Sequence, residues 1–124
     1  MIISVPKEIM PGENRVACVP DVVPKLIKAG FEVQIEKDAG LTAGFTDDQF
    51  IKAGAKIINS VEQLFSTADI LLKVQRPIEN QSLHKHELDL MKKGSLLIAL
   101  AYVRHYIDVS KQCTEKVLIL FLWM

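Results

Sequence analysis

The sequence lacks a glycine-rich phosphate loop. Neither G-x-G-x-x-G nor G-x-x-x-x-G-K-[ST] occurs anywhere in it, and such loops place a nucleotide phosphate at the N-terminus of a helix. The similar string AGLTAG follows a charged, half-exposed segment and lies several residues before its helix. We therefore predict no nucleotide-phosphate site within this chain.

Charge excess and long apolar runs are also missing. Lysine plus arginine number 15 and aspartate plus glutamate number 15, so no net field favours nucleic acid or an anionic membrane. The longest apolar runs, SLLIALAYV and VLILFLWM, are shorter than the roughly 18 residues that a membrane helix needs. Neither run is therefore predicted to cross a bilayer.

Cysteine is scarce as well. Cys18 and Cys113 lie far apart and no secretory leader precedes the first expected strand. We expect reduced thiols in a cytoplasmic setting. Arg15 could lower the pKa of the Cys18 thiol, but we interpret Cys18 as a buried, unreactive cysteine.

Metal and nucleophile motifs are missing too. His84 and His86 are two residues apart on an expected helix and point to different faces, while His105 begins another helix. This spacing predicts no metal site. No serine lies in a nucleophile elbow, and no carboxylate pair is placed for acid and base catalysis.

What is present is an alternation of strands and helices, within one expected domain over residues 1–124. Strands are predicted at 2–5, 31–37, 55–59, 68–74, 95–103 and 117–124, and helices at 20–29, 46–54, 61–67, 83–94 and 105–116. This order predicts an α/β fold: an open, mostly parallel sheet with helices on both faces, Rossmann-like or flavodoxin-like in three layers. Segment 31–37 alternates apolar and polar residues, so we expect it at an edge.

Polar and charged groups gather after the first and fourth expected strands. Ligands in open α/β sheets bind beyond the carboxyl ends of the strands. Five side chains from these two loops are expected to converge on one rim of the sheet, a hypothesis because the strand order is not readable: Lys7, Arg15, Lys73, Gln75 and Arg76.

The first of these loops carries a resemblance to a known family. The run SVPKEIMPGENRVACVPDVVPKLIKAGFEV is similar to the opening signature of the alanine dehydrogenase and pyridine nucleotide transhydrogenase family, G-[LIVM]-P-x-E-x-x-x-N-E-x-R-V-A-x-[ST]-P. The segments DAGLTAGFTDDQFIKAGAKI and ADILLKVQRPI continue it. Ser4, Gly12 and Val19 depart from the signature. The resemblance covers about the whole chain.

Within this family the resemblance implies two alternatives. Alanine dehydrogenases supply an arginine for the substrate carboxylate, a second lysine in KVK and a histidine in the next strand. Here Arg15 is present, but Gln75 occupies the second-lysine position and Tyr102 the histidine position. The string KVQRP, which begins at Lys73, instead resembles the transhydrogenase alpha subunit. We favour that alternative, with Arg15, Lys73, Gln75 and Tyr102 as candidate cleft residues.

The favoured alternative implies hydride transfer from NADH to NADP in a complete, proton-translocating enzyme. Its nucleotide-binding domain would follow Met124, so we expect residues 1–124 to be an incomplete N-terminal domain, inactive and without bound cofactor when alone. Expected partners are the remaining transhydrogenase subunits or domains, including a membrane subunit. This places the chain in the cytoplasm or peripherally at the inner face of the membrane.

Two other interpretations stay open. The chain could be a fragment of an NAD-dependent alanine dehydrogenase, or a non-catalytic interaction remnant in which VLILFLWM pairs with a second copy as a homodimer. Arg15 and Lys73 also have two readings. In the first, both residues form the cationic wall of a cleft. In the second, their role is purely structural: Arg15 binds Glu8 or Glu13, and Lys73 fixes the end of a strand.

Overall fold

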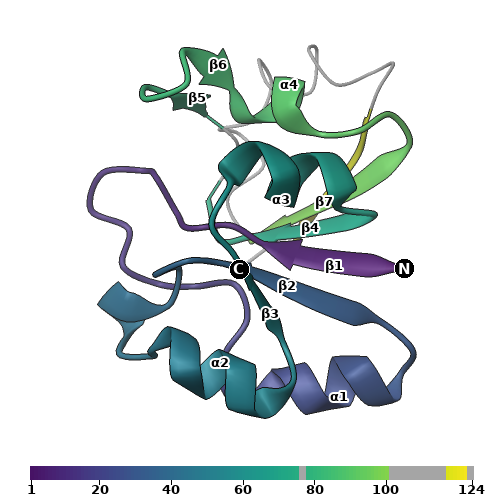
Figure 1. The fold of residues 1–124 in the computed structure, drawn as a ribbon. Helices are drawn as coiled ribbons and strands as arrows, with labels where there is room; N and C mark the ends of the chain where they lie inside the picture. Colours follow the sequence, from purple (N-terminus) through teal and green to yellow (C-terminus); the bar gives the residue numbers. More distant parts are fainter. Residues whose placement is uncertain (76–77, 101–116, 123–124) are drawn as a thin grey trace.

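A parallel sheet forms the centre of the molecule (Figure 1). The computed structural model describes residues 1–75, 78–100 and 117–122. Within them, six strands pair in the order β3-β2-β1-β4-β7-β8, and every neighbouring pair in this sheet is parallel. The strands are β1 (Ile2–Val5), β2 (Glu32–Glu36), β3 (Lys56–Ile58), β4 (Ile70–Lys73), β7 (Ser95–Leu100) and β8 (Val117–Leu122).

Helices cover both faces of this sheet (Figure 1). On one face lie α1 (Val23–Lys28), which follows the short 3-10 turn η1 (Pro20–Val22), and α2 (Asp47–Ala53), which follows η2 (Leu41–Ala43). On the other face lie α3 (Val61–Thr67) and α4 (Glu87–Leu90). The predicted fold class, an open parallel α/β sheet in three layers, is confirmed.

Local sequence signals fix where α2 and α3 begin. The Thr46 hydroxyl accepts the backbone N–H of Gln49, and the Gln49 side chain accepts the backbone N–H of Thr46, so α2 has a complete capping box. The Ser60 hydroxyl caps α3 by accepting the backbone N–H of Gln63 at 3.2 Å. Both caps were predictable from the three-residue spacing alone.

Each face of the sheet has its own apolar core. Between the sheet and helices α1 and α2, the core contains Val5, Val23, Val33, Ile35 and Phe50, together with Cys18, Ala39 and Ala55. Between the sheet and helices α3 and α4, the core contains Phe65, Ala68, Leu71, Leu90, Met91 and Leu97. Successive strand residues point to opposite faces of a sheet. A sheet that is covered on both faces therefore needs apolar residues at consecutive positions of its strands.

The predicted edge position of segment 31–37 is wrong. Strand β2 lies between β1 and β3. Its polar residue Gln34 is 8% exposed, and the Ser4 and Thr67 hydroxyls donate to Gln34 Oε1 at 3.2 and 3.0 Å. A buried amide with such partners is tolerated in an interior strand, and these partners are not visible in the local sequence pattern.

The predicted helix over 83–94 is also wrong. A small antiparallel hairpin, β5 (Glu79–Asn80) and β6 (Lys85–His86), precedes the one-turn helix α4. The Asn80 side chain accepts the backbone N–H of Leu83 at 3.1 Å, and His84 has a left-handed φ of 53°. Asparagine commonly starts such turns through its side chain. The predicted helix over 105–116 lies outside the described residues.

No helix in the described part of the chain is long and apolar enough to cross a membrane.

Candidate functional site at the crevice rim

The central strand pair β1 and β4 is the point where the strand order of the sheet reverses. From β1 the chain continues to β2 on one side, and from β4 it continues to β7 on the other. The chain directions therefore diverge at this pair, where open α/β sheets bind ligands beyond the carboxyl ends of the strands. The loops that leave β1 and β4 form the rim there, as the sequence positions predicted.

Lys73, the last residue of β4, is the centre of a buried ion cluster. Its Nζ lies 3.2 Å from Glu8 Oε1 and 3.3 Å from Glu87 Oε2. The three side chains are between 1% and 2% exposed. A buried charge without a partner would be strongly unfavourable, so the three groups depend on one another. We name Lys73, Glu8 and Glu87 the Lys73 cluster.

The two carboxylates of the Lys73 cluster also accept backbone hydrogen bonds. Glu8 accepts the N–H groups of Val74 and Gln75 at 3.0 and 3.1 Å, and Glu87 accepts that of Ile78 at 2.9 Å. Burial raises the pKa of the Glu87 carboxyl, opposed by Lys73 and by the Ile78 N–H. Glu8 and Glu87 therefore hold the loop that follows β4 at two places.

Glu13 joins the loop after β1 to the loop after β4. Arg15 donates to Glu13 through Nε at 3.0 Å, through Nη2 at 2.9 Å and through its backbone N–H at 2.9 Å. Gln75 Nε2 donates to Glu13 Oε1 at 2.8 Å. Hydrogen bonds from the Arg15 side chain are the main reason why the pKa of Glu13 falls to about 2.

A third loop meets the same rim. The Lys7 backbone N–H donates to Glu36 Oε1, at the end of β2, at 3.1 Å. The Thr42 hydroxyl, in η2, donates to the backbone carbonyl of Asn14 at 3.1 Å. Burial raises the pKa of Glu36. The loop after β1 is thus anchored to the end of β2 and to the turn that follows it.

The structure sorts the predicted site residues into three groups. Arg15 and Gln75 are brought together on Glu13. Lys73 is enclosed in the Lys73 cluster at 1% exposure, below the surface of the rim. Arg76 and Tyr102 lie outside the described residues. Arg15 binds Glu13, one of the two partners named in the architectural alternative. Lys73 ends β4 as that alternative has it, and its binding to Glu8 and Glu87 was not predicted.

Sequence reasoning missed Glu87. It placed this residue in the middle of a long helix, whereas Glu87 begins α4 directly after the hairpin and contacts Lys73, 14 residues earlier. A glutamate in the first turn of a short helix is also compatible with a simple dipole interaction. No local signal in the sequence therefore distinguishes Glu87 from Asp89, which is in the same helix.

Cys18 lies in the core on the α1 and α2 side of the sheet and is 3% exposed. Burial raises the pKa of the Cys18 thiol to about 11, so the thiol stays protonated and unreactive at neutral pH. The interpretation of Cys18 as a buried cysteine is confirmed. Cys113 lies outside the described residues.

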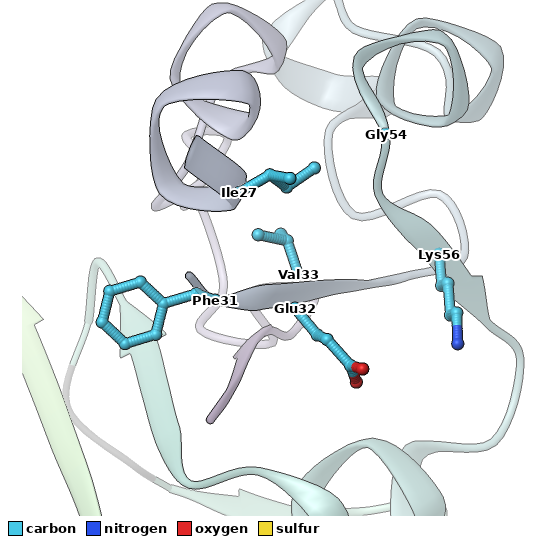
Figure 2. Close-up of a pocket in the computed structure, with 6 residues that line it drawn as sticks. All are labelled: Ile27, Phe31, Glu32, Val33, Gly54 and Lys56. Atoms are coloured by element: carbon cyan, nitrogen blue, oxygen red, sulfur yellow. The ribbon is translucent and has the colours of Figure 1, made fainter. Parts of the chain in front are cut away.

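The described part of the chain also has two hollows outside the contacts of Glu13 and the Lys73 cluster. Figure 2 shows a shallow apolar one of about 140 Å³ at the amino ends of β2 and β3, lined by Ile27, Phe31, Glu32, Val33, Gly54 and Lys56. The other borders the hairpin and is lined by Glu79, His84, Lys85, His86 and Asp89. Among residues 1–75, 78–100 and 117–122, no group of three or more His, Cys, Asp or Glu could hold a metal ion.

Removing the charge of Glu13 should weaken the rim measurably. Glu13→Gln is expected to lower the free energy of unfolding by about 1 kcal/mol at pH 7, because the Arg15 side chain is 59% exposed and solvent screens the pair. The folded pKa of about 2 lies below the ordinary value of 4.5. The stabilisation is therefore present above pH 4.5 and is lost as pH falls through 2.

Carboxyl-carbon NMR of Glu13, with urea denaturation of Glu13→Gln at pH 7, checks this expectation. Glu62→Gln, on the exposed start of α3, is the control and should change the free energy of unfolding by less than about 0.5 kcal/mol. A Glu13 titration midpoint near its ordinary pKa of 4.5 would contradict the contact with Arg15.

The fold defines a class: an open, doubly wound α/β domain, in which ligands generally bind beyond the carboxyl ends of the strands at a switch point such as β1 and β4. The chain belongs to the family of alanine dehydrogenase/PNT N-terminal domains, whose family model matches residues 4–121. The expected family membership is confirmed.

Relatives of both kinds within this family are similar to the chain. The alanine dehydrogenase of Methanococcus maripaludis is 37% identical over 116 residues, which cover 94% of this chain and 30% of that protein. An NAD(P) transhydrogenase alpha subunit polypeptide of Rhodospirillum rubrum is 46% identical over 98 residues, which cover 79% of this chain and 25% of that protein. The matches thus span less than a third of either relative.

Solved structures agree in fold. An L-alanine dehydrogenase superimposes with a TM-score of 0.80 at 30% identity, covering 98% of this chain and 32% of the other. A transhydrogenase from Sinorhizobium meliloti superimposes with a TM-score of 0.70 at 34% identity, covering 82% and 28%. Fold similarity alone therefore does not separate the two activities.

Proposed function

We propose that the chain is the N-terminal domain of an NAD(P) transhydrogenase alpha subunit. The observation that carries this proposal is the contact of Gln75 Nε2 with Glu13 Oε1 at 2.8 Å, on the carboxylate that also binds Arg15. A substrate carboxylate would need the cationic edge that Arg15 turns towards Glu13. The neutral amide of Gln75 supplies no cation beside a substrate carbonyl.

The complete enzyme would transfer a hydride from NADH to NADP, with proton translocation through a membrane subunit. The cofactors carry that chemistry, and this chain supplies position. The chain has no glycine-rich turn that would present backbone N–H groups to a pyrophosphate, and the carboxylates of Glu8, Glu13 and Glu87 are buried against their own donors. We assign NAD and NADP to other parts of the enzyme and expect this chain alone to bind neither.

The partners in this proposal are the remaining transhydrogenase subunits or domains. They would cover the rim and hold the chain in the cytoplasm, peripherally at the inner face of the membrane. Residues 1–124 would then be an incomplete N-terminal domain without activity of its own. A homodimer through VLILFLWM remains the interaction alternative, and size-exclusion chromatography of the purified chain distinguishes it from a monomer.

Alanine dehydrogenase is the second candidate function. It is favoured by the superposition at a TM-score of 0.80 over 98% of the chain. It would require Arg15 to leave Glu13 and bind the substrate carboxylate, and it would require a proton donor and a cation near the substrate carbonyl. Gln75 supplies neither.

A chimera tests the proposal. The 98 matching residues of the Rhodospirillum rubrum subunit are replaced by those of this chain, and the assembled complex is assayed for hydride transfer from NADH to an NADP analogue. We expect activity within about tenfold of the parent, because the nucleotide-binding parts are unchanged.

The reciprocal chimera is the matched control. Placed in the Methanococcus maripaludis alanine dehydrogenase, the residues of this chain should reduce alanine oxidation by roughly a hundredfold or more, because transition-state contacts are lost. Full alanine oxidation by this chimera, with no hydride transfer by the first, would overturn the proposal in favour of the second candidate.

A further inference from the structure

The Lys73 cluster holds both sides of the loop that carries Gln75. On one side, Glu8 accepts the backbone N–H groups of Val74 and Gln75. On the other side, Glu87 accepts the N–H of Ile78, whose carbonyl accepts the N–H of Glu87 at 2.9 Å. Lys73 binds both carboxylates, so the two anchors are linked through one ammonium group.

This arrangement is more than charge neutralisation. One ammonium faces two carboxylates, and each carboxylate directs a second interaction at the backbone. Hydrogen bonds to ionised acceptors are roughly twice as strong as neutral ones, and in a buried cluster each depends on the others. The loop conformation and the cluster should therefore form and break together.

We propose that the Lys73 cluster is a positioning device for the rim, in which Glu8 and Glu87 fix the amides of Val74, Gln75 and Ile78 so that the Gln75 side chain reaches Glu13. Glu87 acts from α4, through Lys73 and Ile78, and is a positioning residue. The inference deepens the proposed function and rests on it, because Gln75 is the residue that carries that function.

The experiment compares Glu87→Ala and Glu87→Gln with two controls in the purified chain. Val33→Ala, in the core below α1 and α2, lowers global stability from the opposite face of the sheet. Glu62→Gln removes an exposed carboxylate. Two NMR signals are followed: hydrogen exchange of the Ile78 amide and the Gln75 side-chain amide resonances.

In Glu87→Ala the Ile78 amide should exchange at least about tenfold faster than in Val33→Ala, compared at equal global stability. The Gln75 side-chain resonances should move towards those of a free amide in Glu87→Ala but stay in place in Val33→Ala. Glu87→Gln keeps an oxygen that accepts the Ile78 N–H, so it should keep the Gln75 signals and show an intermediate exchange rate at Ile78.

The proposal is overturned if Glu87→Ala and Val33→Ala give the same Ile78 exchange and the same Gln75 resonances. If Glu87→Ala does not fold, Glu87→Gln decides: Ile78 exchange equal to that of Glu62→Gln overturns the proposal, and several-fold faster exchange supports it. These signals need no ligand. Inactive chimeras with the signals as expected would therefore count against the proposed function alone.

Discussion

Lys73→Met should lower the free energy of unfolding by about 3–5 kcal/mol at pH 7. Methionine fills most of the lysine volume, so the main effect is electrostatic. The carboxylates of Glu8 and Glu87, with side chains 2% exposed, would lose their shared cation and remain buried. Urea denaturation followed by circular dichroism measures the change.

Lys52→Met, on the exposed side of α2, is the matched control and should change the free energy of unfolding by less than about 0.5 kcal/mol.

The sign of the pH dependence of Lys73→Met gives a second check. Burial already raises the pKa of Glu87, and Lys73 opposes that rise, so without Lys73 the folded pKa of Glu87 would lie further above its unfolded value. The penalty would then shrink as pH falls towards the unfolded pKa of about 4.3. A small penalty, or one independent of pH, would contradict the Lys73 cluster.

Phe50→Ala should have the second large effect, a loss of about 3–5 kcal/mol. Phe50 is 0% exposed and packs edge-to-face on Phe45 at a centroid distance of 6.4 Å. Its ring also lies so close to Gly40 that a Cβ added there would sit 2.6 Å from Phe50 Cε2. The cavity should therefore loosen the loop after β2 as well as the core, which thermal denaturation and amide exchange at Thr42 would both report.

Ile51→Ala provides the control within the same helix. Ile51 is 52% exposed, so its truncation leaves no cavity. Alanine also has the higher helix propensity, so Ile51→Ala should lower the free energy of unfolding by less than about 0.5 kcal/mol. Equal losses for Phe50→Ala and Ile51→Ala would mean that α2 does not pack on the sheet as the structure has it.

The fold class was predictable because it depends on patterns that repeat along the chain. Alternation of apolar strands and capped helices is a local property, and right-handed crossovers convert it into a parallel sheet. The prediction failed where a residue's environment depends on distant partners. The polar residue Gln34 indicated an exposed strand face. The Ser4 and Thr67 hydroxyls instead donate hydrogen bonds to its side-chain oxygen inside the sheet. The Asn80 side chain accepts the Leu83 N–H and so forms a turn where the sequence pattern predicted the start of a helix.

The candidate site was predictable only to the level of loops. Parallel strands place their carboxyl ends on one edge, which brings the residues after β1 and β4 together. Which side chains pair there is decided by tertiary geometry. Lys73 could have faced the crevice, but Glu8 and Glu87 enclose it. Arg15 could have been free, but Glu13 binds its guanidinium.

The central claim is that Glu13 engages both Arg15 and Gln75, so that the rim does not grip a substrate carboxylate. The most direct measurement is a pyruvate titration of the isotope-labelled chain, following the Arg15 Nε–H and Gln75 Nε2–H resonances. We predict that neither resonance shifts saturably below about 1 mM pyruvate, a binding free energy of roughly −4.1 kcal/mol. A saturable shift of the Arg15 Nε–H resonance in that range, with release of the Gln75 amide, would contradict this claim.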